Sequence, residues 1–254
     1  MRGRRPVLAG WRVLVTRPEA QAGALCEQLA AAGAEPVPFP VMEIRYLDRV
    51  DWPAPLESFD YALFVSVNAV AAWRAQAGGR PWPAAVRTLA IGRRTAAAMA
   101  AAGIPAGLAA PSPHTSEALL ALPDLQRLTD CSIVILRGRG GRELIRDTLR
   151  ERGARVECVE LYERALPARD PAPLLQRWYS GGLDAVMVTS NAILDNLLTL
   201  LGESGAALCC GIPAIVPIAP APGKHSLRCG GVGGGGGGVG RDRFREPRML
   251  TTRP

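Results

Sequence analysis

The sequence predicts an α/β protein whose parallel sheets are covered by helices on both faces. Three observations predict this class. Short apolar runs without polar alternation recur along the chain, helix-forming segments separate them, and two parts of the chain repeat the same spacings. Continuous apolar runs are typical of parallel strands, because helices cover both faces of their sheet.

The first strand–helix pair lies near the N-terminus. Residues 13–16 form an apolar, β-branched run that ends at Arg17-Pro18, and residues 19–32 carry apolar residues along one helical face before Gly33 ends the helix. Further strands are expected at 60–65, 89–92, 133–136, 156–161, 186–188 and 214–216. Further helices are expected at 69–76, 95–102 and 142–152.

Two parts of the chain repeat the same spacings. A strand-end arginine and a helix-ending glycine are 16 residues apart both in 17–33 and in 137–153. An aspartate precedes a strand-end serine by six residues both in 60–66 and in 184–190. Chance similarity between strand–helix units is the alternative, but the matched spacings favour two related α/β halves.

The composition indicates a globular body of low net charge followed by a basic tail. The 254 residues correspond to about one and a half to two domains. Apolar residues make up 48% of the chain, which excludes a wholly disordered protein. Residues 219–254 hold seven cations and two anions, which is +5 of the net charge of +7. The body therefore carries only +2 and lacks a footprint for nucleic acid.

The C-terminal segment departs from the repeat. A helix should follow the strand at 214–216, but a proline-rich run comes instead, and nine of the eleven residues in 230–240 are glycine. Such a stretch forms neither a helix nor a core. The body thus lacks its last helix, strand and helix. A reading-frame change and a natural flexible tail both remain as explanations.

Cysteine, histidine and hydropathy patterns indicate a cytoplasmic protein without a metal. The six cysteines show no CxxC spacing, which favours a reducing compartment. With only His114 and His225 available, a zinc site is disfavoured. Arg12 interrupts any apolar N-terminal run, and the uncharged stretch 205–223 contains four prolines. We therefore expect neither a signal peptide nor a membrane helix.

Polar residues follow the predicted strands at the edge where doubly wound sheets bind their ligands. Serine and asparagine here can equally serve as helix N-caps. Three arginine-bearing segments and free helix amides nevertheless favour an anionic ligand. The candidate residues at these strand ends are Arg17, Ser66, Asn68, Thr95, Arg137, Gly138, Arg142, Thr189, Ser190 and Asn191.

The glycine-rich segment 138–143 follows a strand and opens a helix, as a dinucleotide-binding fingerprint requires. Glu143 occupies the third glycine position, where its charge would repel a pyrophosphate, and no acidic residue is clearly placed for a ribose. The match is therefore weak. Phosphate-loop, nucleophile-elbow and HExxH motifs are absent from the sequence.

Tyr162 ends the apolar run 159–161. One interpretation is a half-buried strand tyrosine. The other is a neutral proton donor, because a tyrosine hydroxyl stays protonated at neutral pH and can protonate a poor leaving hydroxyl. The local sequence leaves both interpretations open.

Taken in order, eight segments resemble uroporphyrinogen-III synthases, and together they extend from about residue 11 to residue 217. The order of the segments is more specific than any one of them. The segments are 13–18, 33–44, 64–70, 90–96, 116–119, 136–143, 160–163 and 188–192.

The resemblance implies two Rossmann-like or flavodoxin-like parallel-sheet domains joined by two extended connectors, with the active site in a cleft between the domains. Residues 11–40 plus 168–218 would form a discontinuous domain 1, with its C-terminal part incomplete. Residues 41–167 would form domain 2, and 219–254 a disordered, low-complexity tail.

The implied reaction is the cyclising dehydration of hydroxymethylbilane to uroporphyrinogen III, with inversion of ring D and without a cofactor. Tyr162 would protonate the departing hydroxyl and leave an azafulvene cation. A bond between ring A and the substituted carbon of ring D would then give a spiro intermediate that reopens and closes inverted. Orienting the chain for this bond would be the enzyme's main task.

In this picture the strand-end residues would bind the substrate's carboxylates. The protein would be a cytoplasmic monomer, and hydroxymethylbilane synthase, the preceding pathway enzyme, is a candidate partner. Three alternatives stay open: an inactive or truncated synthase-like protein, a nucleotide- or sugar-phosphate-binding α/β protein, and a nucleic-acid-binding tail. The tail has a single aromatic residue, Phe244, which disfavours base stacking.

Overall fold

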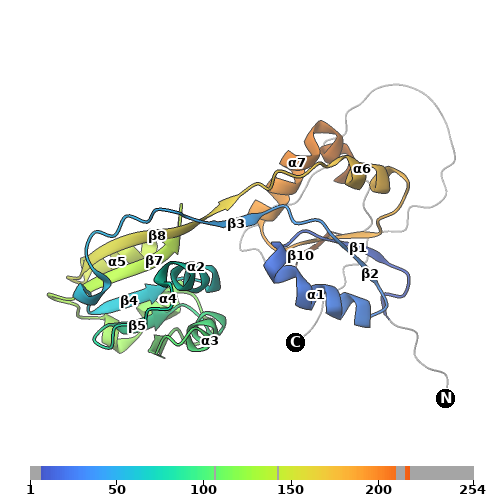
Figure 1. The fold of residues 1–254 in the computed structure, drawn as a ribbon. Helices are drawn as coiled ribbons and strands as arrows, with labels where there is room; N and C mark the ends of the chain where they lie inside the picture. Colours follow the sequence, from blue (N-terminus) through green and yellow to red (C-terminus); the bar gives the residue numbers. More distant parts are fainter. Residues whose placement is uncertain (1–6, 106, 142, 210–214, 218–254) are drawn as a thin grey trace, which may run out of the picture. The chain divides into compact units, whose positions relative to one another are not determined.

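A computed structural model describes residues 7–105, 107–141, 143–209 and 215–217, with side chains as far as residue 202 (Figure 1). Its contacts divide the chain into two compact units. Unit 1 comprises Met1–Glu43 and Leu166–Pro254, and unit 2 comprises Ile44–Ala165. The expected tail 219–254 and the candidate Arg142 lie outside the described residues, as does the place of the expected missing helix, strand and helix.

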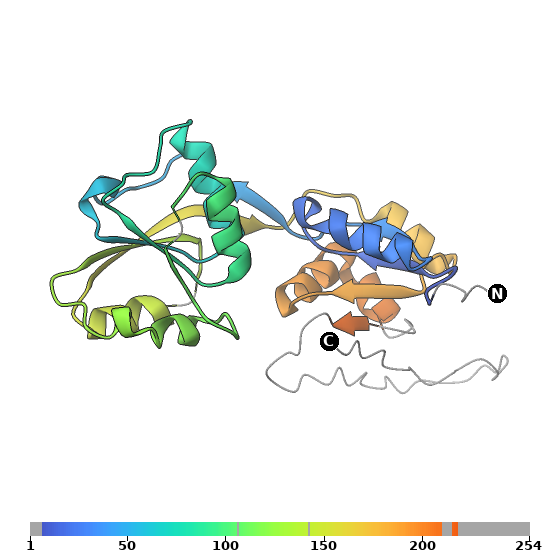
Figure 2. The same cartoon turned by 90° about the horizontal axis from the view of Figure 1, so that it is seen from below.

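Unit 1 contains a four-stranded parallel sheet in the order β10-β9-β1-β2. Helix α1 covers one face, and α6 with α7 covers the other (Figures 1 and 2). Successive residues of β1 point to opposite faces, so Val13 and Val15 pack with α1 while Leu14 packs with α6 and α7. The elements are β1 (Arg12–Val15), α1 (Glu19–Ala31), β2 (Glu35–Pro38), α6 (Ala172–Tyr179), β9 (Ala185–Val188), α7 (Asn191–Cys209) and β10 (Ile215–Pro217).

The edge strand β2 is protected by alternating prolines. The backbone N–H groups of every second residue point toward β1 and the residues that flank it. Phe39, for example, donates to the carbonyl of Val15 at 2.9 Å, and residues 35 and 41 donate to the carbonyls of residues 11 and 16. The positions between them are Pro36, Pro38 and Pro40. An N–H at these positions would point away from the sheet, and proline removes it. The edge is therefore closed to further strand pairing.

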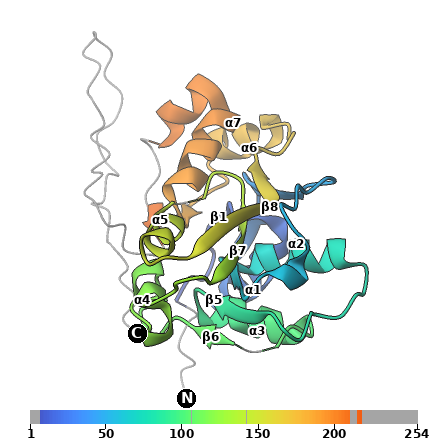
Figure 3. The ribbon, with the colours of Figure 1, turned by 90° about the vertical axis from the view of Figure 1, so that its left-hand side faces the viewer.

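Unit 2 contains a six-stranded sheet in the order β3-β8-β7-β4-β5-β6. The strands β8, β7, β4, β5 and β6 are parallel to one another. Helices α2 and α3 pack on one face and α4 and α5 on the other (Figure 3). The elements are β3 (Glu43–Tyr46), β4 (Tyr61–Phe64), α2 (Val67–Ala77), β5 (Arg87–Ala90), α3 (Arg93–Ala101), β6 (Leu108–Ala109), α4 (Ser116–Leu120), β7 (Ser132–Gly138), α5 (Leu144–Glu151) and β8 (Arg155–Ala165). Two short 3₁₀ segments, Leu56–Ser58 and Pro123–Leu125, complete it.

The two sheets share a common strand order, which confirms the prediction of two related halves. Strands β2-β1-β9-β10 of unit 1 correspond to β8-β7-β4-β5 of unit 2. The helix-ending glycines match as well, because Gly33 and Gly153 both have left-handed backbones, with φ of 87° and 93°. Glycine adopts this conformation without the penalty that a Cβ atom brings, which explains its place after both helices.

The apolar runs predicted as strands are all strands in the structure. Several elements lay outside the sequence prediction. They are the strands β2, β3 and β6 and the helices α4, α6 and α7, of which α7 is broken at Gly202. The predicted helix at 142–152 begins at Leu144, because Glu143 takes the N-cap position.

Candidate active site

The carboxyl ends of the strands in unit 2 bring Ser66 and Tyr162 together. Ser66 follows β4, and Tyr162 lies in β8, two strands away across β7. The Tyr162 hydroxyl lies 2.9 Å from Ser66 Oγ, and either atom can donate this hydrogen bond. The tyrosine is almost completely buried, with 1% of its surface exposed, whereas Ser66 is only half-buried. Ser66 is therefore the more accessible member of the hydroxyl pair.

A β-bulge makes this hydroxyl pair possible. Arg137 of β7 is paired with Glu160 of β8, but the next residue, Gly138, is paired with Tyr162. Leu161 is the additional residue on β8. An inserted residue of this kind changes the face toward which the following side chains point.

The consequence is that Tyr162 changes sides of the sheet. Val156 and Cys158 face the core under α4 and α5, so strict alternation would direct Tyr162 to the same side. Instead, its ring packs with Leu161 in the core under α2 and α3. Only there does its hydroxyl reach Ser66, at the start of α2.

Gly138 provides the space for the tyrosine ring. A Cβ atom on Gly138 would lie 2.6 Å from both Cε2 and Cζ of Tyr162, which is far inside van der Waals contact. Sequence reasoning listed Gly138 as a substrate-binding residue. In the structure, its missing side chain allows a buried aromatic ring to cross the end of β7.

Ser66 also caps α2. Its Oγ accepts a hydrogen bond from the N–H of Ala69 at 3.2 Å, so the N-cap interpretation holds for this serine. A serine oxygen has two lone pairs and one proton, so the cap leaves it able both to accept from and to donate to other hydroxyls. The same atom thus serves the helix and the hydroxyl pair.

Asn68 and Thr95 lie on the same edge of unit 2. Asn68 is half-buried in the first turn of α2. Thr95 lies in the first turn of α3, after the adjacent strand β5, and is 6% exposed. The N-cap of α3 is Gly92, which has no side chain to cap it. The ends of β4, β5 and β8 therefore place hydroxyl and amide groups and a helix start without a side-chain cap along one edge.

Arg137 is buried and paired rather than open to a ligand. It is 8% exposed, and its two Nη atoms form a bidentate pair with Glu143 at 3.0 and 3.2 Å. Glu160 lies 3.8 Å from the same guanidinium. The Arg137 Nε is buried without a partner in the described part of the chain. In this arrangement Arg137 fastens the 138–143 loop to the sheet.

The charges around this loop compensate one another. Arg146 binds Glu143 at 2.7 Å, and Arg139 binds Glu163 at 2.6 Å. The hydrogen bonds from Arg137 lower the pKa of Glu143, and the pKa of Arg137 is raised in turn by Glu143. The carboxylate in the third glycine position is therefore ionised and engaged by arginines, which counts against a pyrophosphate site there.

The remaining candidates lie on unit 1. Arg17 follows β1, is half-buried and forms no ion pair with any described residue. Thr189 is half-buried, and Asn191 is exposed in the first turn of α7. Ser190 Oγ accepts from the N–H of Ile193 at 3.3 Å, which repeats the cap made by Ser66. Strands β1 and β9 are neighbours, so these residues share one edge of the unit 1 sheet.

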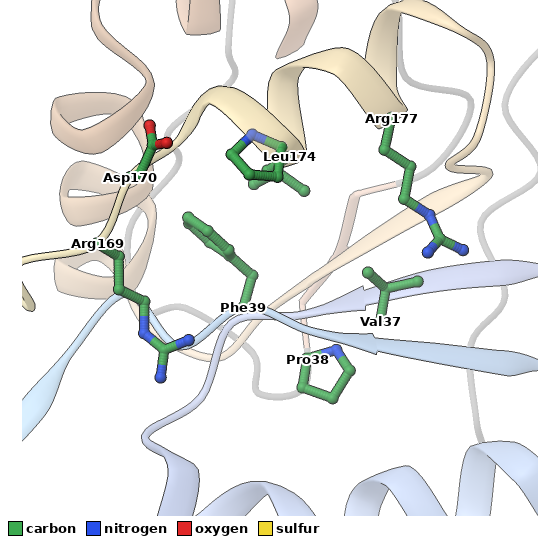
Figure 4. Close-up of a pocket in the computed structure, with 8 residues that line it drawn as sticks. Val37, Pro38, Phe39, Arg169, Asp170, Leu174 and Arg177 are labelled. Carbon is green, nitrogen blue, oxygen red and sulfur yellow. The ribbon is translucent and has the colours of Figure 1, made fainter.

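Unit 1 also contains a mainly apolar groove of about 440 Å³ between the end of β2 and α6. Phe39 and Leu174 form its centre, and Arg169 and Arg177 lie at opposite ends (Figure 4). Both arginines are paired, Arg169 with a glutamate of α1 at 3.4 Å and Arg177 with one of β2 at 2.5 Å. Sequence reasoning did not indicate this groove.

Sequence reasoning assigned no site role to three residues that lie beside the candidate sites. Thr16 is fully buried, and its Oγ1 donates to the carbonyl of Met187 at 2.6 Å, which joins the ends of β1 and β9. Glu143 appeared only as a misfit in a glycine motif, although it pairs with Arg137. His114 appeared only as a potential zinc ligand, although it contacts Gly92. The sequence contains only two histidines, and this rarity was the one signal in the sequence that could have drawn attention to His114.

Within the described ranges, no group of histidine, cysteine and carboxylate side chains is arranged to hold a metal ion. Among the same residues, no helix has both the length and the apolar character to cross a membrane. The fold and the strand-end residues define a class: an α/β protein of two parallel-sheet units with polar groups and arginines at the carboxyl ends of the strands.

Comparison with known proteins gives the family. A family model described as uroporphyrinogen-III synthase HemD matches residues 23–217. The uroporphyrinogen-III synthase of Salmonella typhimurium is 39% identical over 197 residues, covering 74% of this chain and 79% of the relative. That of Escherichia coli is 36% identical, covering 75% and 80%. The chain therefore belongs to the uroporphyrinogen-III synthase family.

Solved structures agree on the fold. A uroporphyrinogen III synthase mutant from Thermus thermophilus superposes with a TM-score of 0.52 at 22% identity, covering 78% of this chain and 80% of that one. The enzyme from Helicobacter pylori gives 0.53 at 14% identity, covering 84% and 94%. At these identities the likeness concerns the architecture.

Proposed function

We propose that this protein is a uroporphyrinogen-III synthase that cyclises hydroxymethylbilane with loss of water and inversion of ring D. Family membership supports the reaction. The observation that carries the proposal at the level of residues is the hydroxyl pair of Tyr162 and Ser66, which lies at the strand ends where α/β sheets bind ligands.

In this proposal the hydroxyl pair supplies the proton for the departing hydroxyl of the substrate. Tyr162 is buried and Ser66 is half-buried, so Ser66 faces the leaving group and Tyr162 replaces the proton that Ser66 donates. The leaving group departs as water, and the substrate becomes an azafulvene cation. The pair regains its proton from solvent after each turnover.

Each unit, taken by itself, carries strand-end groups that can bind substrate carboxylates. Unit 2 offers Asn68, Thr95 and the uncapped start of α3, and unit 1 offers Arg17 with the polar start of α7. Arginines and helix N-termini both attract carboxylates. Arg137 and Gly138 act by shaping the 138–143 loop and by making room for Tyr162.

We further infer domains 11–40 plus 168–218 and 41–167, and a monomeric cytoplasmic enzyme that receives its substrate from hydroxymethylbilane synthase. The composition of the body and the cysteine pattern support the compartment. The instability of the linear substrate, which closes without help to the symmetric isomer I, supports delivery from the preceding enzyme.

The proposal is tested by supplying the full chain with hydroxymethylbilane and measuring the ratio of uroporphyrinogen III to I. Active protein should yield mainly isomer III. Folded protein that leaves the substrate to close into isomer I would refute the proposed activity.

The proton-donor role is tested with Tyr162→Phe. The variant keeps the ring and should fold, but kcat should fall by about 100-fold or more, in the range for general acid catalysis. Tyr179→Phe is the matched control, since this tyrosine is 65% exposed on α6 and should leave the rate unchanged. Ser66→Ala should lower kcat and Ser66→Thr should restore it. An unchanged rate for Tyr162→Phe would remove the acid assignment.

A further inference from the structure

His114 is held in an unusual position at the carboxyl edge of the unit 2 sheet. It follows β6, and its backbone has φ of 60°, a left-handed conformation that non-glycine residues adopt infrequently. Its N–H donates to the carbonyl of Pro111 at 2.7 Å, which folds the loop back toward the sheet. A Cβ atom on Gly92 would lie 3.3 Å from His114 Cβ, so the histidine sits against the start of α3.

One hydrogen bond fixes the orientation and the tautomer of the imidazole. Nδ1 lies 2.8 Å from the carbonyl oxygen of Ala110. A carbonyl oxygen only accepts hydrogen bonds, so Nδ1 must carry the proton that forms this contact. In the neutral ring the lone pair is then on Nε2. The half-buried side chain thus presents a basic nitrogen whose direction is set by its own loop.

The surroundings of His114 favour an anionic substrate. Arg93 and Arg94, in the first turn of α3, are exposed and form no ion pair within the described ranges. Gly92 leaves the N–H groups of the helix start without a side-chain cap. Positive side chains and a helix N-terminus together raise the local concentration of carboxylates.

The same edge carries the hydroxyl pair. Gly92 follows β5 and Ser66 follows the adjacent strand β4, and neighbouring strands lie about 4.8 Å apart. Ser66 and the loop that carries His114 therefore lie at the carboxyl ends of neighbouring strands of unit 2, and we infer that one pyrrole chain can reach both. The two groups are of opposite function, since one can donate a proton and the other can accept one.

The proposed reaction needs both functions. Cyclising dehydration removes a hydroxyl from the terminal hydroxymethyl carbon and a hydrogen from the free α-carbon of the last pyrrole ring. Protonation of the departing hydroxyl yields water. After the final C–C bond has formed at the α-carbon, the C–H bond there breaks, and its electron pair restores the aromatic pyrrole. The proton from that carbon must go to a base.

We propose that His114 is that base: its Nε2 takes the proton from the α-carbon, and the resulting imidazolium releases it to solvent. This role rests on the proposed synthase function and adds a residue to it. Each turnover then returns both sites to their starting state, because solvent resupplies the Ser66–Tyr162 pair and receives the proton from His114.

Two variants distinguish a role of His114 as a base from a hydrogen-bonding role and from a merely structural role. His114→Asn keeps an N–H donor at the position of Nδ1 and tolerates the left-handed backbone, so it preserves the anchor to Ala110 and lacks Nε2. His114→Gln places an amide near the position of Nε2 and loses the anchor. Neither amide accepts a proton at neutral pH.

We expect kcat to fall by about 100-fold in both variants, with KM changed less than about 3-fold. Substrate carrying deuterium at the free α-carbon should then react more slowly in His114→Asn than unlabelled substrate, because C–H cleavage limits the rate once its base is gone. A merely structural role would leave this isotope effect where it is in the wild type.

Each other outcome refutes the role in a different way. Wild-type rates for His114→Asn would show that Nε2 takes no part. Restoration by His114→Gln would show that Nε2 acts through a hydrogen bond instead of as a base. A slow His114→Asn without an isotope effect would place its defect at another step. Wild-type protein that forms no isomer III would refute the synthase function itself, and the base with it.

Discussion

Replacing Gly138 by alanine tests how the buried tyrosine is accommodated. A Cβ atom at this position would meet Cε2 and Cζ of Tyr162 at 2.6 Å and Cδ2 at 3.1 Å. Carbon atoms in contact prefer separations of about 3.5–4.0 Å, so the ring must move by about 1 Å. The ring is 1% exposed and belongs to the same buried cluster as Leu136, Leu161 and Phe64, so it can move only by displacing core side chains.

The expected cost follows from two terms. Overpacking a closed core costs about 1–3 kcal/mol. Moving the ring also breaks the 2.9 Å hydrogen bond between Tyr162 and Ser66, which adds about 1 kcal/mol. Gly138 has no left-handed backbone, so no φ strain contributes. The free energy of unfolding of unit 2 should therefore fall by about 2–4 kcal/mol, and kcat should fall with it.

Urea unfolding followed by tryptophan fluorescence measures this loss, since Trp73 and Trp82 pack in the same core as Tyr162. The clash requires the ring, so Gly138→Ala should cost much less when Tyr162 is already leucine. Gly140→Ala is the matched control. A Cβ atom on Gly140 would meet no other atom within 4 Å, but the backbone there is left-handed, with φ of 72°. This substitution should therefore lower the free energy of unfolding by about 1 kcal/mol in both backgrounds. An equal cost of Gly138→Ala in both backgrounds would refute the steric argument.

Three further changes have expected outcomes. Gly23→Ala, in α1 with nothing within 4 Å of the new methyl group, should raise the unfolding free energy by about 0.5–1 kcal/mol in a urea titration. Thr16→Val keeps the shape but removes the bond to Met187 and should cost about 1–2 kcal/mol by the same measurement. Hydrogen bonds from the backbone and side chain of Ser132 lower the pKa of Asp60 below its ordinary value of 3.8. A lowered pKa stabilises the fold above that value, so the advantage of wild type over Asp60→Asn should be full at pH 6 and shrink as the pH falls below about 4. A difference that stays constant between pH 6 and pH 3 would contradict this linkage.

The structure changes the role that sequence reasoning gave to the strand-end arginines. Arg17 and Arg137 occupy equivalent places in the repeat, and both were expected to bind carboxylates. Arg137 is instead buried beside Glu143, six residues further along the chain. Arg17 forms no ion pair with any described residue, and the position six residues further along is Gly23. Equivalent positions in two related units thus have different surroundings.

Much of the fold, and the residues of the candidate site, could be predicted from local sequence. A short apolar run without alternation that is bounded by turn residues favours a buried strand, and a polar residue after it is then expected at the sheet edge, so Ser66 and Tyr162 could be placed at strand ends. Spacing alone also revealed the two related halves, because strand and helix lengths are set by the sheets they cover.

What the tertiary structure decided is how those residues meet. One additional residue in β8 turns Tyr162 to the other face, and no local pattern marks a bulge, since it arises from pairing with β7. The contacts between Gly138 and Tyr162, and between His114 and Gly92, join residues 24 and 22 positions apart. The sequence indicates which groups reach the edge of a sheet because the hydrophobic pattern that marks a strand and its end is local. Only the pairing of distant strands determines which of those groups touch, because register and packing belong to the whole unit.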